Sequence, residues 1–215
     1  MDFDSIAIFL AINALLYILI HLFLDLHMIK NRSLEQSNQR TNYPTWDDKM
    51  PLVKYVTVLT TLYFWAFFIL WPILHVCELD SFFLTFSIKK LPVEVFIQII
   101  GGALIVAGTL MAILGRIARG QESPSWGVPK ALTTHGGFRL VRHPLYASYT
   151  YYFIGLPLLL KNPLLIPLIF GIYGYYAVAK YEEEILLIEF GEEYRKYQQK
   201  VGMLIPFIGK CKKSY

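Results

Sequence analysis

Two polar segments in the second half of the chain hold most of the side chains that could do chemistry. The first contains Arg142-His143-Pro144, which stands where a loop enters an apolar run. Proline suits the first turn of a helix, because its missing N–H would have no partner there, and a helix N-terminus offers N–H groups to an anion. From these three residues alone, an anion-binding site and an ordinary basic anchor at a membrane surface both remain open.

The second polar segment begins with three consecutive carboxylates, Glu182, Glu183 and Glu184, at the start of an expected helix. Acidic side chains stabilise a helix N-terminus because they complement its dipole. A carboxylate turned toward a ligand can instead accept hydrogen bonds from a ribose diol or an ammonium group. The position of the run leaves both roles open.

Several common kinds of site lack their motif in this sequence. There is no G-x-x-x-x-G-K-[ST] phosphate loop, and no G-x-G-x-x-G follows a strand pattern, which disfavours a Rossmann-type site. No cluster of His and Cys has zinc spacing, so we expect no metal. No G-x-S-x-G elbow indicates a hydrolase. The two cysteines, Cys77 and Cys211, lie in unlike contexts and are expected to be free thiols.

The composition of the chain points to a membrane environment. Of its 215 residues, 55% are hydrophobic and only 17% are charged, whereas soluble domains carry about 25% charged residues. The formal net charge is +4. In a membrane protein such a basic excess belongs to cytoplasmic loops, so we expect a lipid bilayer rather than nucleic acid as the partner.

Five apolar runs are expected to cross the bilayer as helices, each of which needs about 20 apolar residues. The runs cover residues 6–24, 52–77, 93–114, 145–160 and 164–179. Only Lys161-Asn162-Pro163 separates the last two runs, which predicts a helical hairpin.

After the hairpin the chain becomes polar, but its apolar residues recur at helical spacing, at Leu186, Phe190, Tyr194, Tyr197 and Val201. This spacing predicts an amphipathic helix that lies under the membrane. Lys and Arg gather after the first run, after the third run and at the C-terminus. Their distribution predicts an N-terminus outside and a C-terminus in the cytoplasm, with both polar segments on the cytoplasmic side.

Together, the two polar segments resemble a known family, the isoprenylcysteine carboxyl methyltransferases and their prokaryotic relatives. Those enzymes carry R-H-P-x-Y at a loop-to-helix junction, then an apolar hairpin, then E-E-x-x-L-x-x-x-F-G-x-x-Y-x-x-Y and a Pro. The chain matches with Arg142-His143-Pro144-Leu145-Tyr146, and then with Glu182-Glu183, Leu186, Phe190-Gly191, Tyr194, Tyr197 and Pro206. The earlier half of the chain matches the family only in hydropathy.

The resemblance implies an all-α integral membrane methyltransferase that uses S-adenosylmethionine and releases S-adenosylhomocysteine. It implies three N-terminal spans in residues 1–115 and a cofactor-binding catalytic region in residues 116–215, where the hairpin and the C-terminal amphipathic helix close a cytoplasmic-face site. Carried over by position, the implied cofactor-binding residues are Gln121, Lys130, Ala131, Leu132, Thr133, Phe138, His143, Pro144, Leu145, Tyr146, Glu182 and Glu183.

Two positions depart from the family pattern and bear on the acceptor. Many relatives have Gly where this chain has Ser148, and often an Arg, thought to hold the acceptor's carboxylate, where it has Val178. Lys180 does not replace that Arg by register, and a Lys lacks the two-pronged donor geometry of Arg. Arg116 and Arg119 remain candidates for the missing charge.

The expected acceptor is a lipophilic or small molecule that offers a carboxylate, as in isoprenylcysteine, or a thiolate. A carboxylate is already ionised at neutral pH, and the sequence shows no dedicated base. Two other functions stay open. Sterol-type membrane reductases, which use NADPH, have a related R-x-P-x-Y junction. A non-enzymatic membrane protein or transporter is the other alternative, and it would place ionisable residues in mid-span.

Overall fold

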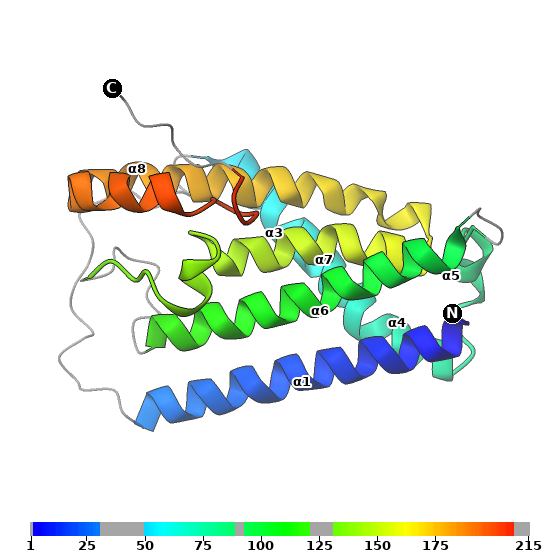
Figure 1. Cartoon of the computed structure of the whole chain (residues 1–215). Helices are drawn as coiled ribbons and strands as arrows, with labels where there is room; N and C mark the ends of the chain where they lie inside the picture. Colours follow the sequence, from blue (N-terminus) through cyan, green and yellow to red (C-terminus); the bar gives the residue numbers. More distant parts are fainter. Residues whose placement is uncertain (1, 31–49, 89–92, 121–130, 209–215) are drawn as a thin grey trace.

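The computed structural model of the chain describes residues 2–30, 50–88, 93–120 and 131–208. In these residues the regular structure is helical, apart from one isolated bridge between Val141 and Gly202 (Figure 1). The α-helices are α1 Phe3–Lys30, α3 Pro51–Trp65, α4 Trp71–Val76, α5 Ser81–Thr85, α6 Glu94–Arg119, α7 Pro144–Leu160 and α8 Ile169–Lys200. Shorter helical segments are the π-helix η2 Ala66–Leu70 and the 3₁₀ turns η4 Gly136–Arg139 and η5 Pro163–Leu168.

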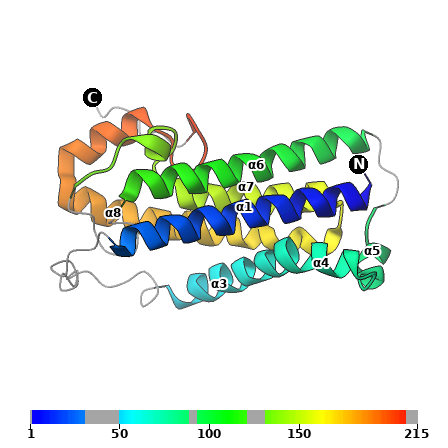
Figure 2. The same ribbon diagram turned by 90° about the horizontal axis from the view of Figure 1, so that it is seen from below.

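The long helices run lengthwise beside one another in a single bundle (Figures 1 and 2). Helices α6 and α7 lie closest, because glycines spaced seven apart line the contact. A Cβ at Gly101 would lie 2.6 Å from the Leu159 nitrogen, and one at Gly115 would lie 2.7 Å from Pro144 Cγ. Small residues of this kind let helix backbones approach in lipid. The contact fixes the start of α7 against the end of α6.

Four helical segments are long and apolar enough to cross a membrane, and they make the chain a multi-pass membrane protein. They are Phe3–His27, Pro51–Val76, Glu94–Arg119 and Pro163–Lys200. The fifth expected run corresponds to α7, which has 17 residues. That length is at the lower limit for a spanning helix, so the count of five spans stays a prediction.

The predicted helical hairpin is present in α7 and α8, which run in opposite directions (Figure 1). Lys161 ends α7 in the left-handed region with φ 51°, and the Asn162 side chain accepts a hydrogen bond from the Leu164 nitrogen at 3.0 Å. The residues that separate the two apolar runs therefore form a turn with its own cap.

The polar C-terminal part differs from the expected separate helix. Helix α8 runs without a break from the hairpin through Tyr181, so Glu182 to Glu184 lie inside a helix and do not complement the dipole of an N-terminus. The break comes instead at Gly191, where φ is 49° and ψ is −121°. L-residues with a side chain rarely adopt this conformation. After Gly191 the chain folds back toward η4 and the start of α7 (Figures 1 and 2).

Candidate functional site

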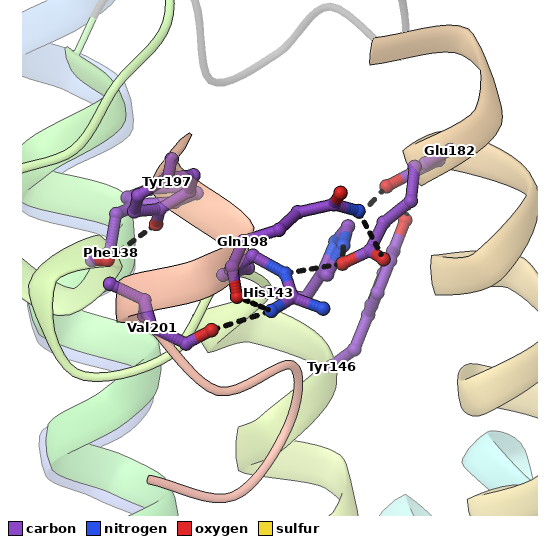
Figure 3. Close-up of polar contacts among 9 residues, drawn as sticks. Phe138, His143, Tyr146, Glu182, Tyr197, Gln198 and Val201 are labelled. Carbon is purple, nitrogen blue, oxygen red and sulfur yellow. Dashed lines mark hydrogen bonds and ion pairs between the residues drawn. The ribbon is translucent and has the colours of Figure 1, made fainter. Parts of the chain in front are cut away.

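A buried arginine joins three parts of the chain at one end of the bundle. The Arg142 guanidinium donates from Nε to Glu183 Oε1 at 2.5 Å, and from Nη1 to the carbonyl oxygens of Val201 at 2.5 Å and Gln198 at 3.2 Å (Figure 3). Arg142 is only 4% exposed. A buried charge is stable only when it is paired and hydrogen-bonded, as it is here. This guanidinium therefore fixes the start of α7, the middle of α8 and the segment after Gly191 to one another.

The carboxylate of Glu183 is occupied by contacts within the protein. Its Oε1 accepts from Arg142, and its Oε2 accepts from the Gln198 amide at 3.0 Å. Glu183 is 9% exposed. With both oxygens engaged, this side chain positions its neighbours.

The His143 ring lies between the two glutamates. Its Nδ1 is 3.5 Å from Glu182 Oε2, and its Nε2 is 3.4 Å from Glu183 Oε1. Burial by itself lowers the pKa of His143, but the two carboxylates outweigh burial and raise this pKa above its ordinary value. Both distances exceed those of good hydrogen bonds, and Nε2 is buried with no hydrogen-bond partner among the described residues.

Glu182 is the carboxylate of this site that reaches solvent. Its Oε1 accepts a hydrogen bond from the Tyr146 phenol at 2.5 Å, and its side chain is 32% exposed. The Tyr146 ring lies nearly parallel to the His143 ring, with centroids 5.6 Å apart. The three side chains present a carboxylate, a phenol and an imidazole at one place (Figure 3).

The segment after Gly191 packs over this cluster and is hydrogen-bonded to it. Residues 201–203 pair with the loop before α7: the Arg142 nitrogen donates to the Gly202 oxygen at 2.8 Å, and the His143 nitrogen donates to the Met203 oxygen at 3.2 Å. A Cβ at Gly202 would lie 2.2 Å from the Ile205 oxygen, so only glycine fits. We call residues 192–208 the C-terminal strap.

The structure brings together four of the residues implied by the resemblance, namely His143, Tyr146, Glu182 and Glu183. Pro144 begins α7 but packs against α6 instead, and Leu145 beside it is half-buried. Phe138 is held through its carbonyl oxygen, which accepts from the Tyr197 phenol.

Of the earlier part of the implied set, the structure describes Ala131, Leu132 and Thr133. Ala131 is exposed, and Leu132 and Thr133 are half-buried in the loop before η4. In the described part of the chain, none of these three forms a hydrogen bond with Glu182 or Glu183. Gln121 and Lys130 lie outside the described residues.

The site also contains residues that sequence reasoning missed. Gln198, Gly202 and Met203 were not singled out, although Gln198 contacts Arg142 and Glu183, Gly202 accepts from the Arg142 nitrogen, and Met203 accepts from the His143 nitrogen. Gln198 is a polar residue on a polar helix, so no pattern marks it. Tyr194 and Tyr197 were predicted to lie on one apolar helix face, and both are buried. That apolar face is the feature of the sequence that indicates packing of the strap against the rest of the protein.

The two departures from the family pattern have clear structural settings. Ser148 donates a hydrogen bond from its hydroxyl to the Leu145 oxygen at 2.6 Å and is buried. Val178 is 1% exposed and carries no charge, while Lys180 is exposed. Arg116 pairs with Asp25. No group of three His, Cys, Asp or Glu in the described ranges is placed to hold a metal ion.

Comparison with known proteins identifies a family and several relatives. Residues 96–193 match the family model described as phospholipid methyltransferase. A protein-S-isoprenylcysteine O-methyltransferase of Tribolium castaneum is 43% identical over 79 residues, which cover 36% of this chain and 28% of the relative. A probable protein-S-isoprenylcysteine O-methyltransferase of Oryza sativa subsp. indica is 29% identical over 120 residues, which cover 53% of this chain and 63% of the relative.

A relative with a different name also matches the chain. Methanethiol S-methyltransferase 1 of Bradyrhizobium diazoefficiens is 39% identical over 70 residues, which cover 33% of this chain and 24% of the relative. The chain spans less than two thirds of the length of each of these three relatives. The matched family segment includes both polar segments and the hairpin between them.

Proposed function

We propose that this chain is a membrane methyltransferase that uses S-adenosylmethionine, because residues 96–193 match the family model of the phospholipid methyltransferases. The relatives named protein-S-isoprenylcysteine O-methyltransferase agree with the resemblance of the two polar segments. The proposed acceptor is a lipophilic or small molecule with a carboxylate or a thiolate. Both acceptor types occur in the names of the relatives, which are O-methyltransferases of isoprenylcysteine and S-methyltransferases of methanethiol.

One observation carries the proposal. The Arg142–Glu183 pair joins two motifs that are 41 residues apart in sequence and leaves Glu182 partly exposed beside His143 and Tyr146. A purely structural ion pair would not require a second, solvent-reaching carboxylate next to a buried histidine. Strongly paired and buried titratable groups of this kind gather at functional sites.

The side chains at this place fit the chemical groups of the cofactor. The Glu182 carboxylate can accept from an ammonium group or a ribose diol. His143 Nε2 is a buried nitrogen without a hydrogen-bond partner among the described residues, which a ligand can supply. Bound S-adenosylmethionine supplies a methyl group that its sulfonium already activates. We therefore assign cofactor binding to His143, Tyr146 and Glu182. The other residues implied by the resemblance remain candidates, namely Gln121, Lys130, Ala131, Leu132, Thr133, Phe138, Pro144 and Leu145.

The protein's own contribution is positioning and the exclusion of water. Correct alignment of two reactants can supply about 7–11 kcal/mol of a barrier. Arg142 and Glu183 are positioning residues in this scheme, because they hold α7, α8 and the C-terminal strap in register. The strap covers the loop before α7 through Tyr197 and residues 201–203.

The proposal includes an orientation and a division of the chain. We place the site on the cytoplasmic face, with the N-terminus outside, because Lys and Arg gather on that side. Residues 1–115 then form the three spans that support the catalytic region, and residues 116–215 form that region itself.

Calorimetry on the detergent-purified chain tests the function. Separate titrations with S-adenosylmethionine, S-adenosylhomocysteine and NADPH should show binding of the two sulfur nucleosides and none of NADPH. Glu182→Gln should weaken S-adenosylhomocysteine binding by about tenfold, since a charge-assisted hydrogen bond is worth about 1.5–3 kcal/mol. The matched control is Glu184→Gln, which changes an exposed neighbour and should leave the affinity as it was.

Two other results would overturn the proposal. Binding of NADPH alone would identify a reductase of the sterol type. Absence of binding by all three compounds would favour a non-enzymatic membrane protein or a transporter.

A further inference from the structure

A second cluster of polar side chains lies between α1 and α6. Arg116, near the end of α6, forms an ion pair with Asp25 on α1, and its side chain is 17% exposed. His21 precedes Asp25 by one helical turn and therefore lies on the same face of α1, beside this pair. Tyr17 lies one turn before His21. We call these four residues the α1–α6 cluster.

The hydrogen bond of His21 defines which ring nitrogen carries a proton. Nδ1 lies 2.9 Å from the Tyr17 backbone oxygen. A carbonyl oxygen only accepts, so Nδ1 is the donor, and in the neutral ring Nε2 carries a lone pair. The ring is held by stacking on Tyr17, with centroids 3.9 Å apart and planes inclined by 19°. His21 thus has the tautomer and the fixed orientation of a general base.

Two nitrogens of the cluster have no hydrogen-bond partner among the described residues. They are His21 Nε2 and Arg116 Nε, and both atoms are buried. The first offers a lone pair and the second an N–H. Buried polar atoms are normally hydrogen-bonded, so two unpaired ones in neighbouring side chains point to a ligand that completes them.

The α1–α6 cluster lies at the same end of the bundle as the candidate cofactor site. In both views, the C-terminal ends of α1 and α6 lie at the end where α7 begins and the strap folds back (Figures 1 and 2). Gly115, next to Arg116, packs against Pro144, the neighbour of His143.

Aromatic rings connect the cluster to the cofactor site. The Trp65 ring lies 5.0 Å from the Tyr17 ring, and its indole nitrogen lies 3.4 Å from the Tyr149 hydroxyl. The ring centroids of Tyr149 and Tyr175 lie 4.6 Å apart, and those of Tyr175 and Tyr146 lie 5.4 Å apart. This row of ring contacts links the α1–α6 cluster to Tyr146, which donates a hydrogen bond to Glu182.

We propose that the α1–α6 cluster binds the reacting group of the methyl acceptor, and that this acceptor is a thiol. The inference rests on the proposed methyltransferase function and narrows its acceptor. A thiol offers one S–H and a sulfur that accepts, which complement the His21 Nε2 lone pair and the Arg116 Nε–H. A carboxylate is ionised at neutral pH and only accepts, so one of its oxygens would face the lone pair of His21.

The setting of Val178 agrees with this assignment. The buried valine provides no charge at its position on α8. Within the α1–α6 cluster, the one guanidinium is that of Arg116, which is already paired with Asp25, and the one nitrogen base is His21. That combination suits an acceptor that must lose a proton before it reacts.

The transfer step balances with these groups. The thiol loses its proton to His21 Nε2, and its sulfur forms a bond to the methyl carbon of the bound sulfonium. The bond between that carbon and the sulfonium sulfur breaks, and its electron pair stays on the departing sulfur. The products are a methyl thioether, S-adenosylhomocysteine and a His21 imidazolium, which returns its proton to water. Tyr17 and Asp25 on α1, Arg116 on α6, and Tyr149 and Tyr152, which contact Tyr17 from α7, are the titratable groups around this ring.

A matched pair of acceptors tests the proposal without any substitution. Octanethiol and octanoate share the same chain length and differ in the reacting group. The detergent-purified chain with labelled S-adenosylmethionine should methylate octanethiol at least tenfold faster than octanoate. Preferential methylation of octanoate would overturn the thiol assignment while leaving the methyltransferase function intact, whereas failure to bind S-adenosylhomocysteine would refute that function itself.

Variants separate the role of His21 from a structural role. His21→Gln should lower kcat/KM for octanethiol by about 100-fold or more, the usual contribution of a general base, with S-adenosylhomocysteine affinity unchanged. Its residual rate should rise with pH as water ionises the thiol, while the wild-type rate should change less. Arg116→Lys keeps the charge but loses Nε–H and should raise KM for the thiol. The control is His27→Gln, an exposed histidine on the same helix.

A measurement without turnover completes the test. Octanethiol titrated into the chain saturated with S-adenosylhomocysteine should bind about tenfold more weakly to His21→Gln than to wild type or His27→Gln. Equal binding and equal rates in all three proteins would overturn the assignment of His21.

Discussion

The two ends of the helical bundle each hold a cluster of buried polar side chains, but they differ in how completely those side chains are paired. At the end formed by α4, α5 and the hairpin turn, His75 uses both ring nitrogens, toward Asp80 at 2.8 Å and Asp4 at 3.0 Å. Asn162 donates to the Phe83 oxygen and the Ser87 hydroxyl. We call this the hairpin end, and the end with Arg142 the site end.

The site end of the described chain keeps several buried ionisable atoms that form no hydrogen bond. Among the described residues, His21 Nε2, Arg116 Nε, His143 Nε2 and the Tyr194 hydroxyl are buried with no hydrogen bond. At the hairpin end, the corresponding atom is the indole nitrogen of Trp71, which does not ionise. Complete pairing is typical of a cluster that stabilises the fold, whereas unpaired ionisable atoms indicate a place where a ligand completes the pairing. The comparison therefore predicts that the two ends respond differently to substitution.

The largest effect is expected from Arg142→Met. Removal of one partner from a buried ion pair leaves an uncompensated charge and typically costs about 3–5 kcal/mol. The free energy of unfolding, measured with denaturant in detergent, should fall by that amount. Arg195→Met is the control, because Arg195 pairs with Glu192 on the surface at 64% exposure, and exposed pairs contribute about 0–1 kcal/mol. Similar small losses in both variants would contradict the assigned role of Arg142.

Two buried amides provide the direct test of the comparison. Asn162→Ala at the hairpin end and Gln198→Ala at the site end each remove a buried hydrogen-bonding group, and each should destabilise the fold by about 1–3 kcal/mol. Only Gln198→Ala should also weaken S-adenosylhomocysteine binding, because Gln198 holds Glu183 at 3.0 Å. Calorimetry and unfolding on the same samples separate the two readouts. Equal loss of affinity in both variants would remove the distinction between the ends.

A smaller effect is expected at Gly191, where the strap begins. A side chain at its φ of 49° and ψ of −121° introduces backbone strain of about 1–3 kcal/mol. Gly191→Ala should therefore displace the strap and weaken S-adenosylhomocysteine binding together with stability. Gly102→Ala is the control, because a Cβ there would lie 3.8 Å from the nearest atom, on Phe9, and this variant should leave both stability and binding unchanged. Unchanged binding in both variants would show that the strap does not close the site.

The sequence was sufficient for the parts of the fold that depend on local patterns. Apolar runs predicted the four helical segments that are long and apolar enough to span a membrane, and Lys161-Asn162-Pro163 predicted the hairpin, because hydropathy and turn residues act locally. The motif residues His143, Tyr146, Glu182 and Glu183 were placed by family resemblance and do meet in space.

What the sequence could not predict depends on contacts between distant segments. The expected helix start at Glu182 to Glu184 was wrong because α8 continues through these residues. The break lies at Gly191, and the helical spacing of this polar stretch does not mark its position. Gln198 contacts Glu183 only because the chain reverses there. The sequence also could not predict that His21 Nε2 lacks a hydrogen bond, since this depends on the tautomer fixed by the Tyr17 oxygen and on the position of α6.

The smallest expected effect is a pH dependence that arises at the site end. The carboxylates of Glu182 and Glu183 raise the pKa of His143 above its ordinary 6.5 despite its burial. A raised folded-state pKa stabilises the fold fully below the ordinary value, and the stabilisation is lost as pH rises through the folded-state value. The melting temperature of the ligand-free chain should therefore decline as pH increases from about 6. His143→Gln should flatten that slope, whereas His135→Gln, an exposed histidine, should keep it. An identical slope in His143→Gln would mean that the pH dependence arises elsewhere and that the two glutamates are not held by an imidazolium.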